Sequence, residues 1–169
     1  MDLNATAASL LGFLHDGPMS GWDLMATARA RIGNFWSLTQ SQVYRELAAL
    51  QRAGLVSAGT PGARERRPYE LTPAGRQAFA EWLSRDPGDA QIRYPLLLAI
   101  ALGRYLAPGQ LAAVIAEHRQ RHEQQLASYL AARESVAGDP YAAATLDFGI
   151  RHETAVLDWF AALPAQISG

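Results

Sequence analysis

Arginines are the side chains in this sequence whose type and spacing carry the most chemistry. Between Arg29 and Arg76, eight arginines face three acidic residues, a local balance of +5. From Asp86 to the end, six arginines face nine acids, a balance of −3, so the net charge of −1 combines a basic half with an acidic one. A guanidinium binds phosphates and guanine edges through paired hydrogen bonds that an ammonium cannot form. The basic half therefore suits nucleic acid, although arginine in place of every lysine is also what a GC-rich genome produces.

A helix with one small, polar face lies in the basic half. Thr39-Gln40-Ser41-Gln42 fits a T-x-x-Q capping box, and the helix is expected to run to Ala53 and stop at Gly54. At about 100° per residue, apolar side chains fall on one side and small or polar ones on the other. The apolar side comprises Val43, Leu47 and Leu50, and the outward side comprises Ser41, Arg45, Ala48 and Arg52. A helix that enters the DNA major groove needs such a face, and an ordinary solvated helix has one too.

The segment after this helix is typical of a basic two-stranded wing. Residues 55–57 and 68–71 are expected to pair as strands across the loop 58–67, which is rich in glycine and proline. That loop carries Arg64, Arg66 and Arg67. Backbone phosphates are natural partners for these charges, although a charged loop taken alone is usually only solvated.

The rest of the chain is predicted to be helical. One helix spans Leu3 to Leu14, and a second is capped by Ser20, with Asp23 in the capping-box position, and ends at Gly33. Another begins at Thr72-Pro73. Beyond a break at 86–89, helices are expected over 95–106, 108–136 and 141–163.

The predicted fold class is therefore mainly α. We expect a winged helix-turn-helix domain with a two-stranded wing over residues 1–85, a linker over 86–94, and an all-helical domain over 95–169.

Three segments of the N-terminal half resemble the PadR family of bacterial transcriptional regulators. They are LLGFLHDGPMSGWDL, FWSLTQSQVYRELAALQRAGLV and RRPYELTPAGRQAFAEWL. The remainder, with IRYPLLLAIALG and ETAVLDWFAAL, resembles the helical C-terminal domain of the longer branch of that family. The sequence departs from the common family pattern, which often has Pro-Gly-Ser where Thr39-Gln40-Ser41 stands and proline where Arg45 stands. A difference in base preference is expected at those positions.

The resemblance implies a cytoplasmic, homodimeric repressor without a cofactor. Its expected partners are a roughly palindromic operator in double-stranded DNA, a second copy of itself, and a small aromatic or hydrophobic effector, with no membrane. Two winged domains would lie about one DNA turn apart. The alternative is a winged-helix module that contacts only proteins and does not bind DNA, because fold alone does not settle function.

The candidate DNA contacts fall into two groups. Those expected at the recognition helix are Thr39, Gln40, Ser41, Gln42, Tyr44 and Arg45. Those expected at the DNA backbone and minor groove, from the wing and the second helix, are Trp22, Arg64, Arg66 and Arg67.

The C-terminal half offers candidates for dimerisation and for effector binding. A stripe from Leu111 to Tyr129 with 4-3-4-3-4 spacing indicates helix packing, within one chain or between two, and we favour packing between two. The expected dimer contacts are Leu126, Tyr129, Leu130, Leu146, Ile150, Leu157 and Phe160. The aromatics expected to line an effector pocket, with the core as the alternative, are Trp36, Tyr94, Tyr105 and Trp159.

Other kinds of chemistry find little support in the sequence. There is no cysteine, nucleophile elbow, phosphate loop or dinucleotide fingerprint, so we expect no catalytic residue and no enzyme. His118 and His122 have i, i+4 spacing that two metal ligands can use, but arginines surround them, and we expect ordinary helix or interface histidines and no metal. The longest apolar run, 95–103, is far shorter than the ~20 residues of a membrane span.

Overall fold

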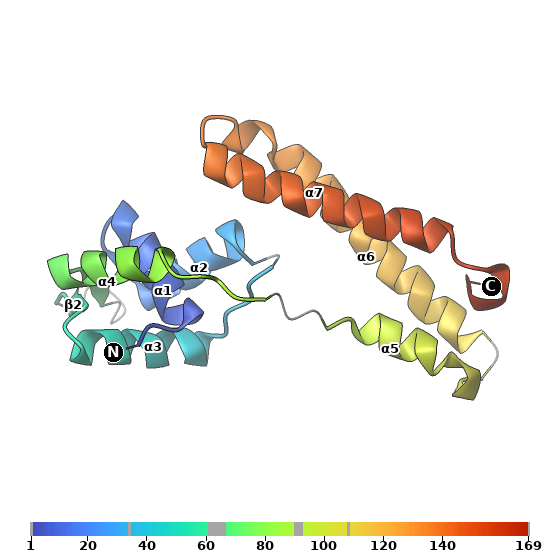
Figure 1. Ribbon diagram of the computed structural model, residues 1–169, viewed down its shortest axis with the longest axis horizontal. Helices are drawn as coiled ribbons and strands as arrows, with labels where there is room; N and C mark the ends of the chain where they lie inside the picture. The colour runs from blue at the N-terminus through green and yellow to red at the C-terminus, as the bar shows by residue number, and fades with distance from the viewer. Residues whose placement is uncertain (1, 34, 61–66, 90–92, 108, 169) are drawn as a thin grey trace. The chain divides into compact units, whose positions relative to one another are not determined.

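The chain folds into two compact units, residues 1–88 and 89–169 (Figure 1). The computed structural model describes residues 2–33, 35–60, 67–89, 93–107 and 109–168. The division falls inside the segment 86–94 that the sequence marks as a linker. Each unit has its own hydrophobic core. The mainly α fold, with a winged helix-turn-helix followed by an all-helical part, is confirmed.

Three helices of the first unit begin at the capping residues that the sequence indicates, whereas the first begins at Ala5, after Asn4, and not at Leu3. Its elements are α1 (Ala5–Phe13), η1 (Leu14–Asp16), β1 (Met19–Ser20), α2 (Gly21–Arg31), α3 (Gln40–Arg52), β2 (Val56–Ala58), β3 (Pro68–Leu71) and α4 (Pro73–Leu83). Ser20 and Thr39 both complete capping boxes, and the Thr72 hydroxyl accepts from the Gly75 amide. Each box satisfies two backbone donors at its helix start, which fixes where α2 and α3 begin.

The wing forms part of a three-stranded antiparallel sheet with the order β1-β3-β2. Val56 pairs with Leu71, and Ala58 pairs with Tyr69, so β2 lies one residue later than the predicted 55–57. The short strand β1 was not predicted. It pairs Met19 with Tyr69 and so attaches the chain before α2 to the wing.

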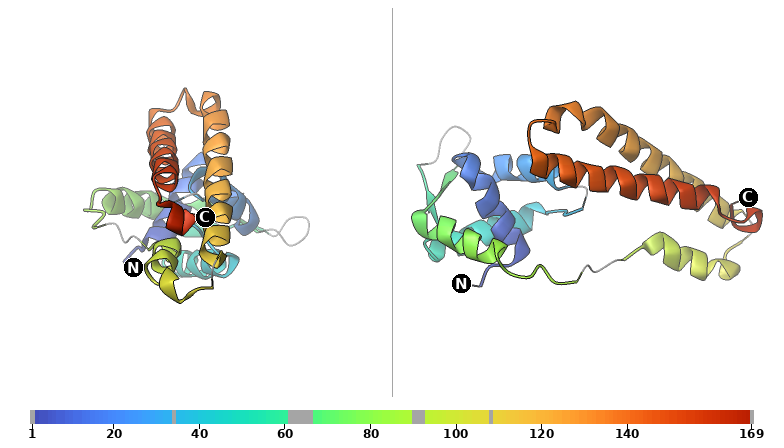
Figure 2. Two further views of the ribbon diagram at one scale, coloured as in Figure 1. Left: turned by 90° about the vertical axis from the view of Figure 1, so that its right-hand side faces the viewer. Right: turned by 45° about the horizontal axis from the view of Figure 1, so that its top comes forward.

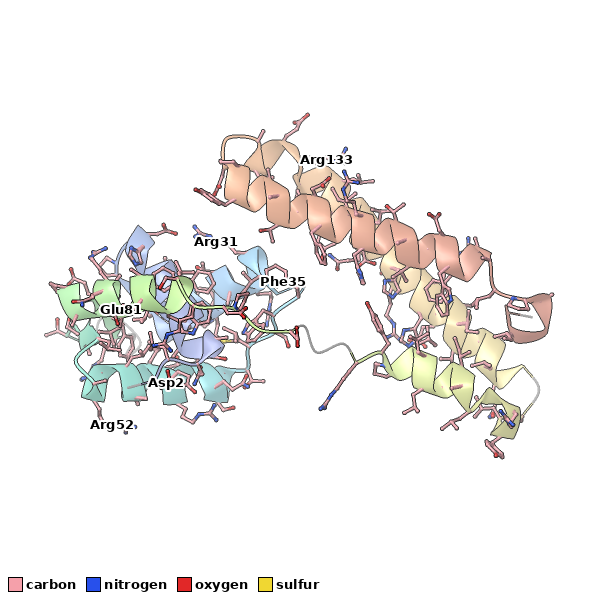
Figure 3. All side chains as sticks on the ribbon, in the orientation of Figure 1. Asp2, Arg31, Phe35, Arg52, Glu81 and Arg133 are labelled. Carbon is pink, nitrogen blue, oxygen red and sulfur yellow. The ribbon has the colours of Figure 1, made fainter. Side chains whose placement is uncertain are left out.

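The core of the first unit holds α3 against α1 and α2. Leu10 and Leu11 of α1 and Leu24 of α2 are fully buried with Val43, Leu47 and Leu50 of α3, which confirms the predicted anchoring side. Gly54, with φ of 71°, ends α3 as expected. Ser41, Arg45, Ala48 and Arg52 are exposed on the other side of α3. Figure 3 shows Arg52 projecting away from the rest of its unit.

The second unit is a long helical hairpin with short helices at one end. Its elements are α5 (Pro95–Ala101), η3 (Gly103–Tyr105), α6 (Gln110–Ala132), η4 (Glu134–Val136), α7 (Pro140–Ala161) and α8 (Ala165–Ser168). The left view of Figure 2 shows α6 and α7 running side by side. None of the helices in the described ranges is long and apolar enough to cross a membrane.

Three predicted helix limits in the second unit were wrong. The helix predicted over 95–106 ends at Ala101 and tightens into η3, where a Cβ on Gly103 would lie 2.6 Å from Leu111 Cδ2 of α6. Gly109, with φ of 80°, precedes α6, and α6 ends at Ala132 rather than 136. The last predicted helix ends at Ala161, and the chain turns after Pro164 into α8. Glycine and proline therefore divide apolar runs that periodicity alone joins.

Candidate nucleic-acid interface

The N-terminus of α3 presents two polar side chains outward and uses a third for its own cap. Gln40 and Ser41 are exposed. Gln42 is half-buried, and its Oε1 accepts from the Thr39 amide and the Thr39 hydroxyl, both at 2.9 Å. The Gln42 amide in turn donates to the Thr39 hydroxyl at 3.3 Å. Thr39 is exposed as well, and its hydroxyl lies 3.2 Å from that of Ser41, so Gln40 is the member of the predicted Thr39–Gln42 set that takes no part in these cap contacts.

Two aromatic residues stand beside this end of α3. Trp22 at the start of α2 is 57% exposed and Tyr44 is 44% exposed. The Tyr44 ring lies over Gly21, where a Cβ would come within 2.6 Å of Tyr44 Cε1. A hollow of about 220 Å³ separates α2 from α3, and its lining comprises Trp22, Met25, Ala26, Arg29, Gln40 and Tyr44.

Arg29 was not among the predicted site residues. It is exposed on α2 and lines the same hollow as Trp22. The signal was present in the sequence, because Trp22, Met25, Ala26 and Arg29 follow the i, i+3, i+4, i+7 pattern of one helix face. The structure thus brings a further guanidinium to the face that carries Gln40 and Tyr44.

Arg45 extends outward from the middle of α3 and is paired with the next residue. Its side chain is 67% exposed, while that of Glu46 is 8% exposed. Arg45 Nη2 donates to Glu46 Oε1 at 3.1 Å, and Arg45 Nε lies 3.4 Å from the same oxygen. The buried carboxylate of Glu46 was not predicted.

The wing contributes one described arginine to the interface. Arg67 is exposed and immediately precedes β3, where the Gly59 amide donates to the Pro68 carbonyl at 2.8 Å. Arg64 and Arg66 lie outside the described residues. Arg67 therefore marks the edge of the sheet from which the predicted basic loop extends.

The helical unit contains a separate pocket of about 490 Å³ between α5, α6 and α7. Its lining comprises Tyr94, Pro95, Leu96, Leu97, His118, His122, His152, Ala155, Val156, Trp159 and Phe160. The Tyr94 hydroxyl lies 3.3 Å from His152 Nε2, and the two rings are stacked. His122 Nδ1 lies 2.5 Å from Oε2 of the buried Glu153. The pocket is therefore apolar with three imidazoles in its wall.

The structure gathers half of the predicted effector-pocket aromatics. Tyr94 and Trp159 line the same pocket. Tyr105 is 80% exposed on η3 and does not line it, and Trp36 belongs to the first unit. His118 and His122 were paired by their i, i+4 spacing on one helix, whereas His152 lies on α7 and joins them only through tertiary contact.

The predicted dimer contacts occupy different environments within one chain. Tyr129, Ile150 and Phe160 are buried by packing inside the second unit. Leu126, Leu146 and Leu157 are half-buried, and Leu130 is exposed. Burial and the Glu153 carboxylate raise the pKa of the Tyr129 hydroxyl above its usual range. Contact with a second copy stays a prediction for all seven.

The described residues contain no cluster suited to metal binding. Among them, no group of three or more His, Cys, Asp or Glu side chains is arranged to hold an ion. His122 instead pairs with Glu153, and His118 lines the pocket.

Each of the two units matches a known family model. Residues 10–81 match the model of the transcriptional regulator PadR-like family, and residues 92–167 match that of the virulence activator alpha C-terminal domain. The negative transcriptional regulator PadR of Bacillus subtilis is 25% identical over 173 residues, covering 94% of this chain and 95% of that relative.

Solved structures share the fold across both units. The crystal structure of Bacillus subtilis PadR in complex with operator DNA has a TM-score of 0.79 at 22% identity, covering 94% of this chain and 97% of that one. The same protein in complex with p-coumaric acid has a TM-score of 0.77 at 22% identity, covering 98% and 100%.

The match over residues 10–81 places the winged unit in a class of transcriptional regulators. Within that class the two matched models together span residues 10–81 and 92–167. The chain belongs to the PadR-like family, in the longer branch that carries the helical C-terminal domain.

Proposed function

We propose that this regulator is a homodimeric repressor that binds a roughly palindromic DNA operator and is released by a small aromatic effector. The observation that carries the DNA-binding part is the exposed face of α3. Gln40, Ser41, Tyr44 and Arg45 are all exposed there, on a helix whose opposite side is fully anchored. Such a face can meet base edges without any change in the core. The complex of Bacillus subtilis PadR with operator DNA supports the same use of this fold.

The backbone contacts follow from position and charge. Trp22 and Arg29 stand across the hollow from Tyr44, and Arg67 lies at the wing. We assign them, with Arg64 and Arg66 of the predicted loop, to phosphates and the minor groove. These contacts supply affinity and position, whereas Gln40, Ser41 and Arg45 supply sequence choice.

A binding assay with the full-length protein tests the DNA-binding part. Fluorescence anisotropy against duplexes from the region upstream of its own gene should show salt-dependent, sequence-selective binding. Arg45→Ala should cost about 1–3 kcal/mol at one or two base positions, because a base-edge contact is lost. The matched control is Arg133→Ala, which removes an exposed arginine from the second unit. Absence of salt-dependent binding to any duplex would favour the protein-interaction alternative, and equal selectivity of wild type and Arg45→Ala would remove Arg45 from the reading face.

The effector part rests on the pocket of the helical unit. At about 490 Å³ it has the size of ordinary ligand sites, and its wall combines Trp159 with imidazoles from α6 and α7. Its described lining contains no carboxylate, and the nearby Glu153 carboxylate is paired with His122, so the imidazoles are the polar groups that would meet an acidic aromatic molecule. The complex of Bacillus subtilis PadR with p-coumaric acid supports a small aromatic ligand.

Calorimetry with p-coumaric acid as the probe tests this pocket. Binding by the wild-type protein should be weakened by Trp159→Ala, because the ring contact is lost, and unaffected by Tyr141→Ala. Tyr141 is an exposed aromatic of the same unit outside the pocket. The acid should also release the operator duplex in the anisotropy assay. Equal losses in both variants would place the ligand elsewhere.

Dimerisation is supported by apolar surface on the second unit. Several large side chains there are exposed in the single chain: Leu97, Leu98, Leu102, Tyr105, Leu106, Leu130 and Phe148. Exposed apolar side chains that gather on one surface are typical of an interface. Sedimentation equilibrium should give twice the mass of one chain, and Leu130→Glu should shift the protein towards monomer.

A further inference from the structure

Glu46 is the one acidic residue of α3, and its carboxylate is buried although the helix must approach a polyanion. Its carboxylate pairs with the guanidinium of Arg45, which is itself mostly exposed. Burying a carboxylate is costly unless it is paired, so the interaction is expected to persist when the surroundings change. A pair of this kind, one residue buried and its neighbour exposed, fixes a long side chain that would otherwise sample many rotamers.

The contact uses one particular edge of the guanidinium. Arg45 Nε and Nη2 form the side edge of the guanidinium, and both face Glu46 Oε1. Of the three donors that remain, one N–H of Nη1 and the second N–H of Nη2 form the end edge. That edge carries two parallel N–H groups, and guanine presents the matching acceptors O6 and N7 in the major groove.

We propose that Glu46 is a positioning residue that turns the end edge of Arg45 towards a guanine in each operator half-site. The inference rests on the proposed function. It adds the base that Arg45 recognises and the residue that orients Arg45 for that contact. Glu46 also offsets one positive charge on the DNA-facing surface. It therefore lowers attraction to any phosphate backbone while favouring one base, which raises the ratio of specific to non-specific binding.

The test is a selection experiment on a duplex library with randomised positions, using the full-length protein. Wild type should select guanine at one position per half-site, and Arg45→Ala should remove that preference. Glu46→Gln keeps the side-chain shape but removes the charge, and Glu46→Leu removes the acceptor. Guanine preference at the same position should fall, by roughly 5- to 150-fold for Glu46→Leu, as for loss of one bidentate pair.

The affinity for random-sequence DNA separates positioning from a structural role. It should stay equal or rise in both Glu46 variants, because a negative charge is lost, whereas partial unfolding would lower it. Glu81→Gln is the matched control, since it removes an exposed carboxylate of α4 that pairs with Gln77 and does not touch Arg45. It should leave guanine preference unchanged. In the double variant Arg45→Ala, Glu46→Leu, the preference should be no lower than in Arg45→Ala alone.

Two results would overturn the inference. An Arg45-dependent guanine preference that survives in both Glu46 variants would show that Arg45 needs no positioning by its neighbour. Selection of a base other than guanine at the Arg45-dependent position would show that the end edge is not what is used. Absence of wild-type binding to any duplex would instead overturn the proposed function, and this inference with it.

Discussion

Single residues on the face of α3 depend on neighbours that sequence spacing does not connect. Tyr44 lies over Gly21 because that position has no Cβ, and the ring is held beside the start of α2. An alanine there would place its Cβ 2.6 Å from Tyr44 Cε1. The ring is the outer end of a half-exposed side chain, so it can swing aside while the core stays intact.

We therefore expect Gly21→Ala to weaken DNA binding with little loss of stability. Alanine is the better helix former by up to about 1 kcal/mol, which offsets part of the crowding. Anisotropy should show weaker operator binding than wild type, and thermal melts should differ by only a few degrees. Adding Gly21→Ala to Tyr44→Ala should cause no further loss, because both changes act through one ring. A large drop in melting temperature would contradict this account.

Among the elements, α3 begins at a cap formed by two of the predicted DNA-contact residues, Thr39 and Gln42. The Thr39 hydroxyl accepts from the Gln42 amide, and Gln42 Oε1 closes the box. Thr39→Ala should lower the free energy of unfolding by about 1 kcal/mol, because the first turn of α3 loses its acceptor. Thr39→Ser should retain most of it. Denaturant titrations of the two variants check this, and equal midpoints would show that the hydroxyl contributes nothing.

How far each element could be predicted depends on whether its cause is local. The starts of α2, α3 and α4 were predicted because Ser20, Thr39 and Thr72 act on amides within three residues. The strand β1 was missed because Met19 finds its partner Tyr69 far along the chain. A two-residue strand carries no periodicity of its own.

The candidate sites also combine features with a local cause and features that depend on tertiary packing. The exposure of Arg45 follows from helix geometry, but the burial of Glu46 beside it depends on how α3 packs. The pocket of the helical unit combines His122 and His152 from the two helices of a hairpin, and spacing along one helix cannot predict that. The same limit applies to the stripe ending at Tyr129, which periodicity assigns to helix packing without naming the partner helix.

At the scale of the whole molecule, charge and core are divided between the two units. The first unit contains a complete core, from Leu10 of α1 to Leu71 of β3, without any residue of the second. A protein of residues 1–88 is therefore expected to fold, with a helical circular dichroism spectrum. Under the proposed function it lacks the dimer interface, so each molecule makes half the phosphate contacts of the dimer.

The slope of log K against log salt should then fall by about half for the fragment, because that slope is proportional to the number of phosphates contacted. Anisotropy at four salt concentrations, with the full-length protein as control, measures both slopes. An unchanged slope would mean that one winged unit makes all the contacts.

Tyr94 belongs to two features of the second unit: it is the N-cap residue of α5, and it lines the pocket. The chain that leaves the first unit at Gly88 enters α5 through it. Under the proposed function, a ligand that fills the pocket would contact the residue where that connection ends, and its effect on operator binding would obey thermodynamic reciprocity. If a bound effector lowers the affinity for the operator by some factor, bound operator lowers the affinity for the effector by the same factor. Protein already on DNA would then respond only at higher effector concentrations than free protein does.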